Sequence, residues 1–210
     1  MNDIVIIGAG GFGREVAWLI ERINNKTPTW NLLGFVDDNT SLHGSILDGY
    51  PVLGGEEFLH EKSLWVICAI GSAKTRKQVV NRIEKLKTIQ FATLIDPSVI
   101  MSNRVSIGEG SIICAGTVIT VDVTIQSHVI INLDCTIGHD GVIARFVTMY
   151  PSVNVSGMVS IGECSEIGTG SQIKQGINIG DNIITGAGAV IVKDIEQSGT
   201  YVGVPVSFIK

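Results

Sequence analysis

From Met101 onward the chain repeats every six residues, and this period limits the possible folds more than any other feature. Ile, Val or Met stands at fifteen of sixteen successive sixth positions from Met101 to Ile191, and Thr185 is the exception. Glycine often follows, as in Gly108 and Gly138, and a small or branched residue stands four places after the apolar one. Six residues suit one short strand and one tight corner, where glycine is favoured. The pattern therefore predicts a β-solenoid with a continuous apolar core.

The preceding part of the chain alternates short apolar runs with helical patterns. Strands are predicted over 3–7, 32–36, 64–70 and 91–95, and helices over 12–23 and 75–86. Strand, helix and strand repeated in this order imply a small parallel α/β sheet with helices on both faces. Because the pattern changes at Pro97, we expect two domains, a Rossmann-like domain over 1–96 and a solenoid over 97–210 with a short C-terminal tail.

A glycine-rich loop, GAGGFG, joins the first predicted strand to the first predicted helix. Gly8, Gly10 and Gly13 fit the GxGxxG pattern, and Asp37 ends the second predicted strand. Glycines let a backbone approach a phosphate closely, and a helix N-terminus attracts its charge. The loop therefore indicates a phosphate-bearing ligand. Three interpretations remain open: a sugar nucleotide, which we favour because a nicotinamide enzyme needs more sheet, a dinucleotide, or a purely structural turn.

Composition excludes several classes of function. The net charge is −5 and no basic run is present, which argues against nucleic-acid binding. The four cysteines show no CxxC or other metal spacing, so we expect no metal and a reducing compartment. The N-terminus has no basic region before its apolar run, and no apolar run reaches the ~18–20 residues that cross a bilayer. We expect a cytoplasmic protein without membrane insertion.

Four features taken together resemble a known family. GAGGFGREV at 8–16, FVDD at 35–38, AIG at 69–71 and the C-terminal hexapeptide repeat are similar to sugar acyltransferases of the sialic acid O-acetyltransferase type. The bacterial UDP-4-amino-sugar N-acetyltransferases share this architecture. The resemblance implies a left-handed parallel β-helix with three hexads per coil, acetyl-CoA as co-substrate and a homotrimer. It also implies that the small domain holds a nucleotide-linked sugar, through Gly10, Gly11, Phe12, Asp37, Asp38 and Gly71.

Acetyl transfer from a thioester requires a base for the attacking group and donors for the oxyanion. The resemblance identifies His139, in the sequence IGHD, as that general base, with Asp140 assisting it. Asn132 matches a polar residue near the reacting group in relatives, although a corner amide is an alternative interpretation. The other histidine of the solenoid, His128, matches no functional position, and we expect a solvated corner residue there.

The same resemblance implies that CoA lies in a groove between neighbouring β-helices. The implied wall positions are Thr148, Gly157, Thr169, Gly186 and Pro205, with the Gly157 amide as an oxyanion donor. Some relatives carry a second histidine where Thr148 stands, so the acceptor sugar is left open, as is the choice between N- and O-acetylation. Two other functions remain: a non-catalytic trimeric protein that binds nucleotide sugars, and a serine-type O-acetyltransferase for a small metabolite.

Overall fold

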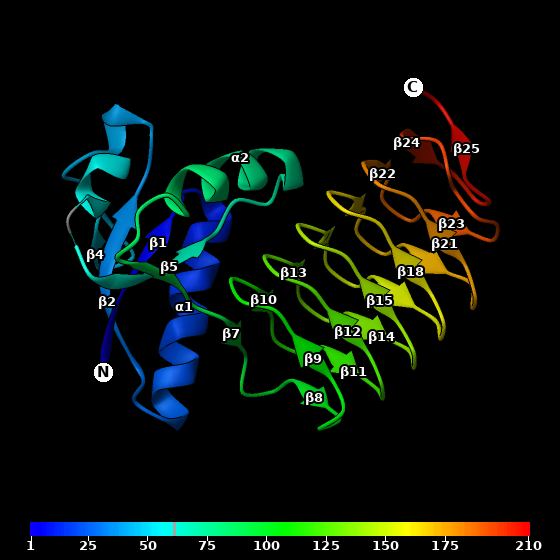
Figure 1. Ribbon diagram of the computed structural model, residues 1–210, viewed down its shortest axis with the longest axis horizontal. Coiled ribbons are helices and arrows are strands. Elements are labelled where there is room, and N and C mark those ends of the chain that lie inside the picture. Colours follow the sequence, from blue (N-terminus) through cyan, green and yellow to red (C-terminus); the bar gives the residue numbers. More distant parts are fainter. Residues whose placement is uncertain (61) are drawn as a thin grey trace. The chain divides into compact units, whose positions relative to one another are not determined.

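The computed structural model describes residues 1–60 and 62–210, and the chain divides into two compact units, Met1–Pro97 and Ser98–Lys210 (Figure 1). The first is a small α/β unit and the second is a stack of short parallel strands, which confirms the predicted fold class. Within the described ranges, no helix combines the length and the apolar character needed to span a membrane.

The small unit is built on a four-stranded parallel sheet. Its strands are β1 (Asn2–Ile7), β2 (Trp30–Val36), β5 (Leu64–Cys68) and β6 (Ile89–Phe91), in the order β2-β1-β5-β6. Helix α1 (Gly11–Lys26) connects β1 to β2, and α2 (Ala73–Ile83) connects β5 to β6. The two crossovers lead outward from the centre in opposite directions, so their right-handedness puts the helices on opposite faces. The carboxyl ends of β1 and β5 therefore flank a crevice where ligands bind in such sheets.

Smaller elements complete this unit: an antiparallel hairpin of β3 (Ile46–Leu47) and β4 (Tyr50–Pro51), and 3₁₀ turns at Thr40–Leu42 and Glu56–Leu59. The strand β7 (Leu94–Ile95), which follows β6 in the chain, pairs in the eight-stranded sheet of the solenoid. The predicted strand over 91–95 is wrong in one respect, because the structure divides this segment between β6 and β7. The predicted strand over 64–70 ends earlier, at Cys68, where the chain turns into the segment before α2.

The solenoid has three faces of short parallel strands. Face 1 consists of β7, β10 (Ile112–Ile113), β13 (Ile130–Ile131), β16 (Thr148–Met149), β19 (Glu166–Ile167), β22 (Ile183–Thr185), β24 (Gly199–Val202) and β25 (Ser207–Phe208). Face 2 consists of β8 (Ile100–Met101), β11 (Val118–Ile119), β14 (Thr136–Ile137), β17 (Asn154–Val155), β20 (Gln172–Ile173) and β23 (Val190–Ile191). Face 3 consists of β9 (Ser106–Ile107), β12 (Thr124–Ile125), β15 (Val142–Ile143), β18 (Ser160–Ile161) and β21 (Asn178–Ile179).

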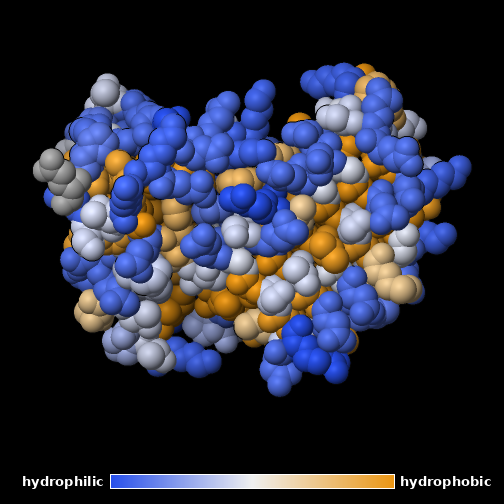
Figure 2. Space-filling model, viewed as in Figure 1, coloured by the Kyte–Doolittle hydropathy of each residue, from blue (hydrophilic) through white to orange (hydrophobic). Residues whose placement is uncertain are grey.

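The six-residue period determines this core. From β8 to β20, each strand pairs with the third strand after it along the chain, as Ile113 does with Ile131 and Ile119 with Ile137, so three hexads make one coil of a left-handed β-helix. Every sixth residue from Ile113 to Ile191 is at most 4% exposed. Met101, in the first coil, is 43% exposed, because that coil has a solenoid neighbour on one side only. Figure 2 shows hydrophobic residues as a band over the strands and hydrophilic residues along the edges.

The corners are made differently from the sequence prediction. The residue three places after the apolar one has a positive φ, as at Asp122, Asp134 and Asp140. Glycine adopts this conformation most easily, and aspartate and asparagine are the next most tolerant residues. The glycine directly after the apolar residue has a different role, because its missing side chain lets the backbone of the next coil approach. A Cβ at Gly138 would lie 2.5 Å from the backbone nitrogen of Gly157 in the next coil. These glycines therefore let successive coils approach each other.

Candidate active site

The glycine loop combines one glycine required for packing with two that face open space. A Cβ at Gly13 would lie 2.0 Å from the carbonyl oxygen of Gly8, so α1 can pack against β1 only with glycine there. A Cβ at Gly10 or Gly11 would meet nothing within 4 Å. Gly10 is the N-cap of α1 and has no side chain to satisfy the first amides of the helix. The loop thus leaves free amide donors and room for an anion.

This difference gives a sharp test of the loop. Gly11→Val should leave the fold intact but weaken binding of a nucleoside diphosphate by at least about tenfold, because its side chain fills the space that a phosphate needs. Gly13→Ala should instead destabilise the small unit, because its Cβ overlaps the Gly8 carbonyl. Calorimetry with UDP and GDP, together with thermal unfolding, separates the two effects. Unchanged nucleotide affinity in a folded Gly11→Val protein would contradict the phosphate site.

A cavity of about 140 Å³ lies beside the loop, at the carboxyl ends of β1, β2 and β5. Its lining residues are Ile7, Gly8, Val36, Asp37, Asp38, Glu56, Ile70, Thr75 and Val79. Pockets that enclose whole ligands usually start at about 300 Å³, so this cavity fits one portion of a larger molecule. Its place in the sheet is the crevice expected for a nucleotide.

The acidic pair at the end of β2 has two separate roles. Asp37 is held by backbone amides, because Ala9 N donates to its Oδ2 and Asn39 N to its Oδ1, each over 2.8 Å. Asp37 therefore fixes the glycine loop to the end of β2. Asp38 is exposed and lies 3.6 Å from Arg82 Nη2, which also pairs with Glu56. Its hydrogen bonds to Glu56 raise the pKa of Arg82, so a cation joins the two carboxylates at the cavity.

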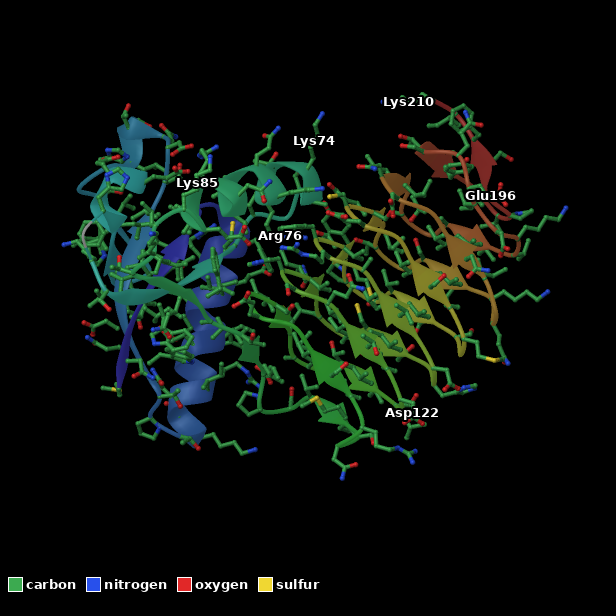
Figure 3. The ribbon with its side chains drawn as sticks, viewed as in Figure 1. Lys74, Arg76, Lys85, Asp122, Glu196 and Lys210 are labelled. Carbon is green, nitrogen blue, oxygen red and sulfur yellow. The ribbon has the colours of Figure 1, made fainter. Side chains whose placement is uncertain are left out.

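The turn after β5 is organised by a residue that the sequence analysis missed. Arg76 extends from α2 and is fully buried (Figure 3). Its Nη1 donates to the carbonyl oxygens of Ile70 over 2.7 Å and Gly71 over 3.0 Å. The predicted substrate residue Gly71 is thus held by its carbonyl, and its partly exposed backbone borders the cavity residue Ile70. Phe12, on the first turn of α1, is half-buried.

His139 and Asp140 lie on the corner between face 2 and face 3. His139 Nδ1 is 2.7 Å from Asp140 Oδ2, and the two side chains are 47% and 59% exposed. A carboxylate at this distance favours the tautomer with the proton on Nδ1, which leaves Nε2 as a proton acceptor. Asp140 has a positive φ, as does Asp122 at the equivalent position one coil earlier. The pair therefore has the arrangement of an accessible, oriented base.

Gly157 supports the imidazole from the next coil. It occupies the position of His139 one coil later, and a Cβ there would lie 2.4 Å from His139 Nε2 and 2.6 Å from Cε1. Met158 N also donates to the His139 carbonyl oxygen over 2.7 Å. Only glycine at this place leaves room for the ring. Gly157 thus contacts the candidate base itself, a role that the spacing of one full coil could have indicated.

The remaining predicted positions lie elsewhere on the solenoid. Asn132, Thr169 and Gly186 all lie on the corner between face 1 and face 2, so a single coil stack does not bring them to His139. Asn132 is nearly buried, and its Oδ1 accepts from Leu133 N over 2.7 Å. Thr148 is buried in β16, and Pro205 is exposed between β24 and β25. The expected roles of these residues stay predictions.

The interpretation of His128 as a solvated corner residue is wrong. His128 is 1% exposed, and its ring stacks on Phe146 of the next coil with centroids 5.1 Å apart and planes 7° apart. A Cβ at Gly110, one coil earlier, would lie 2.1 Å from His128 Nδ1. The ring fills the interior of the corner between face 3 and face 1. This histidine is part of the packing of the solenoid.

Comparison with known proteins gives a domain match and sequence relatives. Residues 3–83 match the PglD N-terminal domain. GDP-perosamine N-acetyltransferase from Escherichia coli is 32% identical over 180 residues, which cover 84% of this chain and 80% of the relative. UDP-N-acetylbacillosamine N-acetyltransferase from Bacillus subtilis is 33% identical over 120 residues, which cover 55% of this chain and 52% of the relative.

Two solved structures are similar to this chain over almost its whole length. The acetyltransferase domain of PglB from Neisseria gonorrhoeae, in complex with acetyl coenzyme A, is 33% identical with a TM-score of 0.91 and covers 99% of both chains. PerB from Caulobacter crescentus, in complex with CoA and GDP-perosamine, is 29% identical with a TM-score of 0.88 and covers 100% of this chain and 98% of PerB. With its glycine loop, its β-helix and its His139–Asp140 pair, the chain belongs to the family of bacterial nucleotide amino-sugar N-acetyltransferases that carry a PglD N-terminal domain.

Proposed function

We propose that this enzyme transfers the acetyl group of acetyl-CoA to an amino group of a nucleotide-linked sugar, with His139 as general base. The observation that carries this is the His139–Asp140 pair on an exposed corner, with its ring seated over Gly157. A β-helix that served only as a trimerisation rod would not need an oriented histidine there. The names of the relatives, which are N-acetyltransferases for two different nucleotide sugars, support an amine as the acceptor.

The geometry supports direct attack. The sugar amine attacks the thioester carbonyl carbon while His139 Nε2 accepts its proton, and Asp140 stabilises the imidazolium through Nδ1. The tetrahedral intermediate then expels the CoA thiolate, which the imidazolium protonates, to give the amide and free CoA. A cysteine acyl-enzyme is disfavoured in the two cysteines whose pKa values are shifted, because burial raises them to about 12 for Cys68 and about 11 for Cys135.

The small unit is proposed to hold the nucleotide. Its cavity takes the base or ribose, and the open amides at Gly10 and Gly11 take the phosphates. In this arrangement Asp37 contributes by holding the loop, whereas exposed Asp38 is available for contact with the ligand.

The solenoid is proposed to work as a homotrimer that holds acetyl-CoA in a groove between neighbouring chains. The support is the separation of the predicted site residues: Asn132, Thr169 and Gly186 lie on one corner, whereas His139 and Gly157 lie on another. Contact between corners of two chains would bring both groups to one ligand, with Thr148 and Pro205 as further wall positions.

Trimer formation has a direct measurement. Multi-angle light scattering at micromolar concentration should give three times the chain mass of 22.4 kDa. This size should persist on dilution, because neither corner alone forms the complete site. A stable monomer that still turned over acetyl-CoA would contradict the shared site.

One assay separates this function from its rivals. Acetyl-CoA is incubated with a panel of UDP-, GDP- and dTDP-linked amino sugars and with L-serine, and release of the CoA thiol is followed. Thiol release that depends on an amino sugar nucleotide is the expected result. Release with L-serine alone would favour a small-metabolite O-acetyltransferase, and binding of sugar nucleotides without release would favour a non-catalytic protein. We place the enzyme in the cytoplasm, since its four cysteines are all buried and none of them forms a disulfide.

A further inference from the structure

Helix α2 carries a charged residue within its buried stripe. The buried residues of this helix are Ala73, Arg76, Val79, Val80 and Ile83, and Arg76 (labelled in Figure 3) is 0% exposed. A buried charge is costly unless hydrogen bonds satisfy it. If this position served only to fill the core, an apolar side chain of similar length, such as methionine, would suffice. The hydrogen bonds of Arg76 therefore indicate what the residue does.

These hydrogen bonds go to the turn that follows β5. Arg76 Nη1 donates to the carbonyl oxygens of Ile70 over 2.7 Å and of Gly71 over 3.0 Å. Hydrogen bonds from a charged donor are stronger than those between neutral groups. Ala69 N also donates to the last carbonyl of β1 over 2.8 Å. The turn over 69–71 is thus held to β1 on one side and to α2 on the other.

The turn over 69–71 contacts both the glycine loop and the cavity. A Cβ at Gly8, the first glycine of the loop, would lie 3.1 Å from the Ala69 carbonyl oxygen and 3.3 Å from Ile70 Cγ1. Gly8 and Ile70 both line the cavity at the carboxyl ends of the strands. A displacement of the turn would therefore change one wall of the cavity and the surroundings of the loop together.

Resting on the nucleotide site proposed above, we propose that Arg76 is a positioning residue for nucleotide binding. It holds the turn over 69–71 in the conformation that the ligand needs before the ligand arrives. Without these hydrogen bonds the turn samples other conformations, and the apparent Kd rises by the factor by which the competent fraction falls. Because Arg76 is fully buried, it acts through the turn and not by touching the ligand. Every contact in this argument lies within the small unit.

The test uses two variants of the full chain. Arg76→Met keeps an unbranched stem but has no donor, whereas Arg76→Lys keeps a charged donor for the carbonyls. The Kd is measured by calorimetry with UDP, GDP and dTDP, and with acetyl-CoA. For the diphosphate that the wild type binds, Kd should rise about 10- to 100-fold in Arg76→Met, because hydrogen bonds from a charged group are lost. Arg76→Lys should recover part of this loss, and the Kd of acetyl-CoA should stay within about twofold in both.

Val80→Ala is the matched control, because Val80 is fully buried on the same helix but is not among the residues that line the cavity. Its substitution should lower the Tm of the protein, since it leaves a space in the core, but the nucleotide Kd should not change. Amide hydrogen exchange over residues 69–72 should be faster in Arg76→Met than in Val80→Ala. These two readouts distinguish a loosened turn from a general loss of stability.

Several results would overturn the role of Arg76. They are a wild-type nucleotide Kd in folded Arg76→Met, equal losses of nucleotide and acetyl-CoA binding, an equal rise of the nucleotide Kd in Val80→Ala, or exchange over 69–72 no faster than in that control. Should Arg76→Met fail to fold, Arg76→Lys decides, and an unchanged nucleotide Kd in it would overturn the proposal. A wild-type chain that bound none of the three diphosphates would contradict the nucleotide site itself, whereas indifferent variants of a binding wild type contradict only the role of Arg76.

Discussion

His139→Ala should lower kcat for acetyl transfer by about 100- to 10,000-fold, the usual cost of removing a general base. The attacking amine must lose a proton, and the structure provides an exposed imidazole whose Nε2 remains an acceptor because Nδ1 is paired with Asp140 at 2.7 Å. Affinities for CoA and for nucleotide sugar should be nearly unchanged, since the His139 side chain is 47% exposed and its loss leaves no cavity in the core. Initial rates of thiol release, with both substrates saturating, measure the effect.

Two carboxylate variants provide matched comparisons. Asp140→Asn should cost less than His139→Ala, because the base remains and only the partner of its imidazolium is weakened. Asp122 (labelled in Figure 3) occupies the position of Asp140 one coil earlier. It pairs with Arg104 at 3.2 Å, so Asp122→Asn should leave kcat unchanged. His128→Ala is unsuitable as a control, because it would remove a buried ring from the solenoid. Wild-type turnover of His139→Ala between pH 6 and 9 would exclude His139 as the base.

The solenoid was predictable because its information is local and repeated. One apolar residue in six sufficed to identify the inward positions, and Ile113 through Ile191 are buried as expected. The same periodicity could not show why particular corners hold glycine. That reason lies in the neighbouring coil: the backbone of Gly157 stands against Gly138. Contacts between successive coils become visible only once the number of hexads per coil is known.

The buried polar groups were the least predictable part. His128 was interpreted as solvated because it stands at a corner, but its stacking partner Phe146 lies at the equivalent position of the next coil. Arg76 interrupts the apolar stripe of α2, and helical periodicity assigns no partner to such a residue, although it holds the carbonyls of Ile70 and Gly71. In each case a contact between distant residues overrides the preference that the residue type suggests by itself.

In the glycine loop, the sequence motif predicted the location of the site but not the role of each residue. Its motif was recognised from spacing, and Gly13 has the packing role that the motif implies. Spacing also identified Asp37 but did not predict its role. Both of its carboxylate oxygens accept hydrogen bonds from backbone amides, one in the loop and one in the following turn. A motif therefore located the functional region, whereas the hydrogen bonds decide which of its residues face a ligand.

Gly157→Ala should lower kcat by about 10- to 100-fold without a large loss of stability, because its Cβ would lie 2.4 Å from His139 Nε2 and must displace the ring. The φ of Gly157 is not in the left-handed region, so alanine fits the backbone and the imidazole is the main obstacle. A base displaced by about 1 Å loses about 100-fold in rate. Thermal unfolding and thiol release, measured on the same preparation, check both halves of this expectation.

This variant also separates two roles for Gly157. If the residue acts only through its amide, as an oxyanion donor, alanine keeps that donor and kcat should hold within about twofold. If it acts by making room for His139, its effect requires the imidazole. In that case the His139→Ala, Gly157→Ala double variant should be no slower than His139→Ala alone, since a ring that is absent cannot be displaced. Additive losses in the double variant would assign to Gly157 a contribution independent of the base, and would contradict the support role.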